Sequence, residues 1–144
     1  MTRDDDLQRL LAAVHSLTRI AAIDTKNDAP AAQWRTLILL RDHGPQRVGD
    51  LAMLSRVSQP GMTRLVHQME AAGLVTRSTL PEDSRVTVVT ATDRGLRDLA
   101  LWLTDLSAAL SPYVADLTDD QWDAVRTSAD ALSARVGLVP EVVR

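Results

Sequence analysis

The sequence predicts a mainly α-helical fold with one small β-hairpin, which is an α+β arrangement. Apolar residues recur every three or four positions through most of the 144 residues, as they do on one face of a helix. Only between residues 74 and 90 does this spacing give way to short runs rich in Val and Thr, which are typical of strands. We therefore expect four helices, a hairpin and two further helices, in that order.

The first two helices are predicted from their spacing and their ends. Apolar residues recur at helical spacing from Asp5 to about Asp24, and the acidic residues 4–6 suit the positive end of that helix dipole. Residues 27–30 contain Asn and Pro and are expected to break the helix. A second helix is expected at about 31–42, where Gly44 is well placed to cap its end.

Two short helices with a tight connection come next. They are expected at 48–54 and 59–72, with Ser58 as the N-cap of the second and Pro60 in its first turn. One face of the second helix is apolar and carries Met62, Leu65, Val66 and Met69. Such a closely connected pair is typical of a helix-turn-helix.

A hairpin follows the second short helix directly. Its strands are expected at 74–78 and 85–90, and a polar turn at 79–84 joins them. Arg85 lies near the tip, with Arg77 on the partner strand, and an arginine at such a tip can enter a minor groove, where negative potential is focused. Asp83 is placed to orient Arg85, or else forms an ordinary turn salt bridge of little energetic value. A ribbon in this position is the wing of a winged helix-turn-helix.

Two more helices complete the predicted fold. Thr92 is placed to cap the first of them, Ser111 and Pro112 are expected to end it, and residues 118–121 form a capping box that opens the second. The leucine stripes near both ends of the chain, with Trp102 and Trp122, exceed what the short middle helices can cover. A second copy of the chain would bury them in a homodimer, although packing within one chain is the alternative.

Composition narrows the classes of function. Cysteine is absent, which excludes disulfides, thiol catalysis, thiol redox sensing and Cys-rich zinc sites. The three histidines lack metal-site spacing and no motif fixes a nucleophile, an acid–base pair or a phosphate loop, so we expect no metal, no cofactor and no enzyme. No apolar stretch approaches the roughly 18 residues of a membrane span. Residues 4–6 are acidic where a secretion signal is positive, so we expect a cytoplasmic protein.

The charge distribution is compatible with a nucleic-acid partner despite the formal net charge of −3. Residues 41–97 hold eight arginines and six acidic residues, whereas the remainder of the chain is acidic. A difference of this size also arises by chance. A positive middle between acidic ends nevertheless suggests a segment that contacts DNA.

The polar side of the predicted helix 59–72 carries no acid before Glu70. Side chains that can read base edges or bind phosphate lie on or beside it, namely Gln59, Thr63, Arg64, His67 and Gln68. A face that is merely solvated would also be polar, but such faces usually mix both signs of charge. The wing that follows favours the DNA-binding interpretation.

These residues resemble the MarR family of bacterial regulators. The motifs that carry the resemblance are Val48-Gly-Asp-Leu-Ala, Ser58-Gln-Pro-Gly-Met-Thr-Arg-Leu-Val, Met69-Glu-Ala-Ala-Gly-Leu-Val-Thr-Arg, Asp83-Ser-Arg and Thr90-Ala-Thr-Asp-Arg-Gly. The likeness is close over about residues 30–110 and covers the whole chain in helix order and length. Two departures are Arg47, where Ser or Thr often caps a helix, and Gly61, where the family commonly has a larger residue.

The resemblance implies an obligate two-fold dimer that places a recognition helix in the major groove and a wing in the adjacent minor groove of a pseudopalindrome. The implied DNA-binding residues are Ser58, Gln59, Pro60, Thr63, Arg64, His67 and Gln68 on the helix, with Arg77, Asp83 and Arg85 on the wing. Residues 1–144 would form one MarR-type domain. Within it, about 31–92 would be the DNA-binding lobe, and about 1–25 and 93–144 the dimerisation helices.

The resemblance also implies a possible effector site, because many members of the family release DNA when a small molecule binds between the dimer helices and the DNA-binding lobe. His15, Trp34 and Arg35 are the candidate effector residues here, because a Trp beside an Arg can hold an aromatic anion. The alternative places Trp34 in the core, Arg35 in a surface or interdomain salt bridge and His15 on a helix surface.

We therefore predict a homodimeric repressor that binds double-stranded DNA, with release by an aromatic or phenolic ligand as a further expectation. One alternative is a winged helix used for protein–protein contact, which would need an apolar or acidic recognition face. The other is an enzyme, for which the chain offers no recognisable motif.

Overall fold

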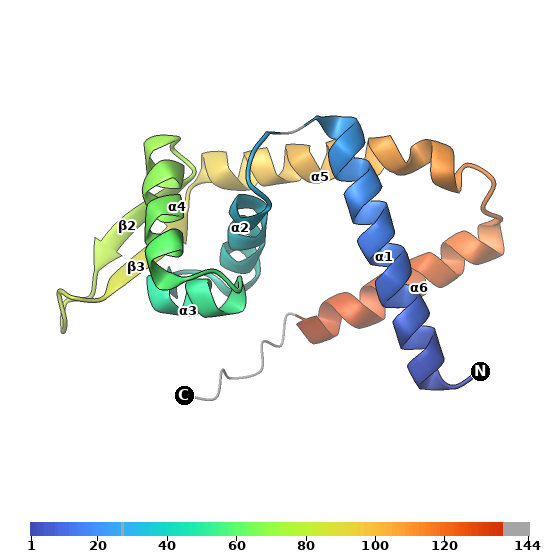
Figure 1. The fold of residues 1–144 in the computed structure, drawn as a ribbon, viewed down its shortest axis with the longest axis horizontal. Helices are drawn as coiled ribbons and strands as arrows, with labels where there is room; N and C mark the ends of the chain where they lie inside the picture. Colours follow the sequence, from blue (N-terminus) through green and yellow to red (C-terminus); the bar gives the residue numbers. More distant parts are fainter. Residues whose placement is uncertain (27, 137–144) are drawn as a thin grey trace. The chain divides into compact units, whose positions relative to one another are not determined.

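A computed structural model describes residues 1–26 and 28–136 of the chain, and these described residues form two compact units that divide between Ala109 and Leu110. The elements are α1 (Arg3–Thr25), α2 (Ala31–His43), β1 (Gln46–Arg47), α3 (Val48–Leu54), α4 (Gln59–Ala71), β2 (Val75–Thr79), β3 (Thr87–Ala91), α5 (Asp93–Val114) and α6 (Asp119–Val136) (Figure 1). Among the described residues, no helix combines the length and the apolar character that a membrane crossing requires. The predicted fold class, mainly helical with a small antiparallel sheet, is confirmed.

The sheet has three strands rather than the two of a simple hairpin. β3 lies between β1 and β2 and pairs antiparallel with both, so that Arg77 faces Val89 across the wing and Gln46 faces Val89 from the other side. β1 has only two residues, which is too short to show the alternation that predicts a strand. The hairpin strands lie one to two residues later than predicted, so Arg85 belongs to the turn and not to a strand.

The core of the first unit joins α2, α3, β2, β3 and α5 around α4. Leu37 from α2, Leu51 from α3, Met62 and Met69 from α4 and Val89 from β3 are all fully buried. All four residues predicted for the apolar face of α4 are buried. Burying side chains of this size stabilises a fold by about 1.5–3 kcal/mol each. The helix is therefore held firmly from one side, which fixes the direction of its opposite face.

The start of α5 is tied to the base of the wing. Thr92 caps the helix as predicted, because its hydroxyl oxygen accepts a hydrogen bond from the Gly95 amide at 3.0 Å. The same hydroxyl donates to the Gly73 carbonyl at 2.6 Å. A Cβ at Gly95 would lie 2.2 Å from the Leu74 carbonyl oxygen, so only glycine permits this approach.

Two expectations for α5 are wrong. Pro112 does not end the helix, which continues to Val114. A proline so close to a helix end removes a single intrahelical hydrogen bond, and the helix accommodates it within its last turn. Trp102 is also not a free apolar surface, because it stacks on Trp34 with ring centroids 4.8 Å apart and planes 9° from parallel.

The outer helices bury little of their apolar surface. In α1 the one buried residue is Ala21, and in α6 none of the described residues is buried. Both helices are nevertheless well capped, α1 by a Thr2–Asp5 capping box and α6 by Thr118 and Gln121 as predicted. Their ends thus support helix formation, whereas their sides offer large apolar groups to solvent.

Candidate nucleic-acid interface

Helix α4 has one buried face and one exposed polar face. Its start is set by Ser58, whose side-chain oxygen accepts a hydrogen bond from the Gly61 amide at 3.1 Å. Pro60 occupies the first turn, where its missing N–H leaves no bond unmade. The exposed face carries Gln59, Thr63, Arg64, His67 and Gln68.

Gly61 is explained by contacts within the chain. A Cβ at this position would lie 2.9 Å from the Ser58 hydroxyl oxygen and 3.1 Å from a methyl group of Val57. The first of these contacts is too close, and it falls on the atom that caps α4. The small residue thus protects the N-cap, which is a local reason for this departure from the family pattern.

Several polar side chains of the α4 face are available to a ligand. Within the part of the chain that the structure describes, the side chains of Gln59, Arg64 and Gln68 make no hydrogen bond or ion pair. Thr63 donates its hydroxyl proton to the Gln59 carbonyl at 3.0 Å, which leaves its oxygen free to accept. The face therefore offers both donors and acceptors, which is what reading base edges requires.

The wing tip carries an oriented arginine. Asp83 accepts two hydrogen bonds from the Arg85 guanidinium, at 3.0 and 3.2 Å, and a third from the Arg85 amide at 3.0 Å. The side-chain hydrogen bond from Arg85 is the main cause that lowers the pKa of Asp83. The Arg85 side chain remains 89% exposed. Asp83 thus holds the guanidinium without covering it, by contacts within one turn of the chain.

At the base of the wing, Arg77 is engaged in a different way. Its Nε donates to Glu70 at 3.1 Å, its backbone amide donates to the other oxygen of that carboxylate at 3.1 Å, and its Nη1 contacts His67 Nε2. The hydrogen bond from the Arg77 side chain is the main cause that lowers the pKa of Glu70. The Arg77 side chain is 35% exposed, far less than that of Arg85.

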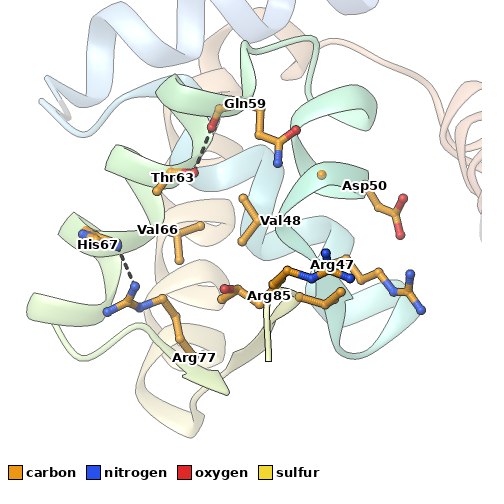
Figure 2. A pocket seen from close by; sticks show the side chains of 12 residues that line it. Arg47, Val48, Asp50, Gln59, Thr63, Val66, His67, Arg77 and Arg85 are labelled. Atoms are coloured by element: carbon orange, nitrogen blue, oxygen red, sulfur yellow. Dashed lines mark hydrogen bonds between the residues drawn. The ribbon is translucent and has the colours of Figure 1, made fainter. Parts of the chain in front are cut away.

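A groove of about 380 Å³ runs between α3, α4 and the wing (Figure 2). Gln59, Thr63 and His67 line it from successive turns of α4, while Arg47 and Arg85 extend along the other side. Val48 and Val66 form part of its wall. The groove thus joins the predicted recognition face to the predicted wing in a single concave surface.

Arg47 is a charged residue of this surface that the sequence interpretation did not assign to DNA binding. It occupies the N-cap position of α3 but makes no side-chain cap hydrogen bond. Its positive charge contributes to lowering the pKa of Asp83. The departure from a Ser or Thr cap was the available signal, since an arginine that does not cap a helix has its donors free for another partner.

The three candidate effector residues are placed apart from this groove. His15 and Arg35 are exposed on α1 and α2, whereas Trp34 is buried against Trp102. The indole N–H of Trp34 has no hydrogen-bond acceptor among the described residues. Among all the described residues, no group of three or more His, Cys, Asp or Glu side chains could hold a metal ion.

Comparisons with known proteins agree on one family. Residues 30–87 match the model of the MarR family. The transcriptional repressor IacR of Pseudomonas putida is 31% identical over 74 residues, which cover 51% of this chain and 44% of that protein. A regulator of the helix-turn-helix type from Mycobacterium bovis, Mb0904, is 28% identical over 109 residues and 76% of each chain.

A solved structure extends the likeness to almost the whole fold. A MarR family protein from Bacillus stearothermophilus superposes with a TM-score of 0.68 over 94% of this chain and 98% of the other, at 21% sequence identity. The relatives carry the names of transcriptional regulators and not of enzymes. The resemblance predicted from the motifs is confirmed.

Proposed function

We propose that this chain, whose residues 30–87 match the model of the MarR family, is a DNA-binding transcriptional regulator of that family and acts as a homodimeric repressor on a pseudopalindromic operator. The observation that carries the proposal is the groove in which the polar face of α4 meets the exposed Arg85 of the wing. A relative named as a repressor supports the direction of the regulation. We place the protein in the cytoplasm, where its DNA lies.

In this proposal α4 enters the major groove and the wing reaches the adjacent minor groove. Arg64 and Gln59 have free donors for base edges or phosphates, and Arg85 is already oriented by Asp83. Arg47 lies with Arg85 on the side of the groove opposite α4, as Figure 2 shows. The DNA backbone that separates a major from a minor groove would pass there, and Arg47 would bind its phosphate.

Dimerisation is supported by the apolar surface of the outer helices. On α1, Leu11 is 68% exposed and Ile23 is 65% exposed, and on α6 Trp122 is 40% exposed. Exposed groups of this size at helical spacing are typical of surfaces that another molecule covers. A second copy would cover the same surface on both chains and set two recognition helices about one DNA turn apart.

The direct test is binding to duplex DNA that flanks the protein's own coding region. We expect tight binding that weakens steeply with salt, and a symmetric footprint. Arg64→Ala should weaken specific binding by about 1–3 kcal/mol if Arg64 reads a base. The control is Arg41→Ala, which removes an equal charge from an arginine that pairs with Asp42 at 2.7 Å outside the α4 face. Wild-type protein that binds no duplex would overturn the proposal.

The wing contact has its own measurement. Arg85→Ala should weaken binding to all duplexes and lower the slope of log affinity against log salt by about one for each phosphate that Arg85 binds in the wild type. The variant Arg126→Ala removes a paired arginine from α6 and should leave this slope unchanged. Equal slopes in wild type and Arg85→Ala would place the wing away from DNA.

Release by a small aromatic acid is the second part of the proposal. A buried donor without an acceptor is costly, and the indole N–H of Trp34 is such a donor. A carboxylate or phenol oxygen would satisfy it. We expect an aromatic acid to release wild-type protein from DNA and Trp34→Phe to lose this response, while Trp122→Phe retains it. An equal response in Trp34→Phe would exclude this site.

A further inference from the structure

We propose that Arg77 positions His67 instead of contacting DNA, and that the Nδ1–H of His67 reads a hydrogen-bond acceptor on the operator. This inference rests on the proposed function, because it assigns the chemistry of one position on the α4 face. It separates two arginines of the wing, Arg85 at the tip and Arg77 at the base, that sequence reasoning treats alike.

The first support is the engagement of the Arg77 guanidinium. Each of its three nitrogens contacts a neighbour, with Nε at 3.1 Å and Nη2 at 3.0 Å from one oxygen of Glu70, and with Nη1 against His67 Nε2. The backbone amide of Arg77 holds the other oxygen of Glu70. Three of the five N–H donors of Arg77 are thus directed at groups of the same chain, which fixes the position of the guanidinium.

The second support is the direction of the contact with His67, drawn as a dashed line in Figure 2. A guanidinium only donates hydrogen bonds, so Nε2 of His67 must accept with its lone pair. For this contact the proton of the ring lies on Nδ1. His67 therefore offers a donor, and not an acceptor, through its remaining nitrogen.

This tautomer has a consequence for sequence preference. In the major groove a donor pairs with N7 or O6 of guanine, N7 of adenine or O4 of thymine, but not with the amino group of cytosine. His67 is exposed on the same face as Thr63 and Arg64, so its free nitrogen is available to a base. We expect one operator position, read by the third turn of α4, to require an acceptor.

Glu70 completes the set by holding Arg77 in place. As a carboxylate it attracts the guanidinium and accepts from both the side chain and the backbone of Arg77. Glu70 is the one acidic residue of α4, and its carboxylate binds Arg77 instead of facing DNA. Contacts between Glu70, Arg77 and His67 thus link the end of α4 to the base of the wing, and the base of the wing to the polar face of α4.

The experiment combines a binding preference with a spectroscopic signature. The ¹⁵N shifts of the His67 ring in the free protein should report the Nδ1–H tautomer in wild type and a shift toward the Nε2–H tautomer in Arg77→Ala. Operators varied at single base pairs should show a preference at one position that falls about three- to tenfold, as for one hydrogen bond, in both His67→Ala and Arg77→Ala. The double variant should lose no more than either single one.

Two further variants separate positioning from direct contact. Arg77→Lys retains the charge but not the fork, so it should lose the preference if Arg77 positions His67 and keep full binding if Arg77 binds phosphate. Thr76→Ala, an exposed neighbour on β2, is the matched control and should behave as wild type. The salt slope should be unchanged in Arg77→Ala.

The outcomes distinguish this inference from the proposed function. A salt slope lowered by about one in Arg77→Ala, with the His67 tautomer unchanged, would overturn the inference and leave DNA binding intact. An Nε2–H tautomer in wild type would overturn it as well. Failure of the wild-type protein to bind any duplex would instead overturn the proposed function.

Discussion

The winged lobe and the outer helices use apolar side chains in opposite ways. In the lobe, Leu51 and Met62 are fully buried by neighbours from the same chain. On α6, Trp122 and Leu132 recur at the same helical spacing but are 40% and 42% exposed. The comparison teaches that helical periodicity predicts a face that will be covered, but does not predict whether the cover comes from the same molecule. The exposed faces define what a second copy has to supply.

The largest effect that sharpens this comparison lies in the lobe. Leu51→Ala should lower the free energy of unfolding by about 2–5 kcal/mol, because it leaves a cavity in a core that cannot collapse fully. Met53 is on the same helix but 51% exposed, so Met53→Ala should change the stability by less than about 0.5 kcal/mol. Urea unfolding of both variants measures the difference. Equal losses would mean that α3 is covered on both sides.

The next effect concerns α6. Leu132→Asp should weaken dimerisation by about 2 kcal/mol or more while leaving the winged lobe folded, because a charge would lie in an apolar interface. Thr127→Asp places the same charge on the other side of α6 and is the matched control. Light scattering over a range of protein concentrations would show a dimer for wild type and control. A wild-type protein that stays monomeric at all concentrations contradicts the dimer.

The helices of both regions were predictable because their signals are local. Apolar spacing, the Ser58 cap, the Thr92 cap and the Thr118–Gln121 box all lie within a few residues of the element that they define. The strand β1 was missed because two residues carry no period, and its partner Val89 is more than forty residues away. Local patterns therefore predict elements well and predict long-range pairing poorly.

The candidate site also combines contacts that are local in the sequence with contacts that are not. Asp83 and Arg85 are two residues apart, so their contact was predicted from the turn alone. The contact of Arg77 with Glu70 and His67 depends on how β2 packs against the end of α4, which no short-range pattern reports. Trp34 and Trp102 stack on each other although they are sixty-eight residues apart in the sequence. Trp102 therefore does not belong to the exposed apolar surface that was predicted for the dimer. Side chains whose partners come from another element need the fold before their roles can be assigned.

The smallest effect tests the wing, the part of the lobe that lies beyond its apolar core. The pKa of Asp83 is lowered from its ordinary value of 3.8, chiefly by the side-chain hydrogen bond from Arg85. A carboxylate whose pKa is lower in the folded state contributes stability above its unfolded pKa, and that stability is lost as the pH falls through the folded pKa. The stability gap between wild type and Asp83→Asn should therefore be constant near neutral pH and should shrink in acid.

Urea unfolding of the two proteins at a series of pH values measures this gap. It should be small at every pH, because Arg85 is exposed and solvent screens the pair. Glu70→Gln should show the same trend, since the pKa of Glu70 is also lowered by an arginine of the wing. A gap that widens in acid would mean that Asp83 carries a raised pKa, and hence that the wing tip folds against a group other than Arg85.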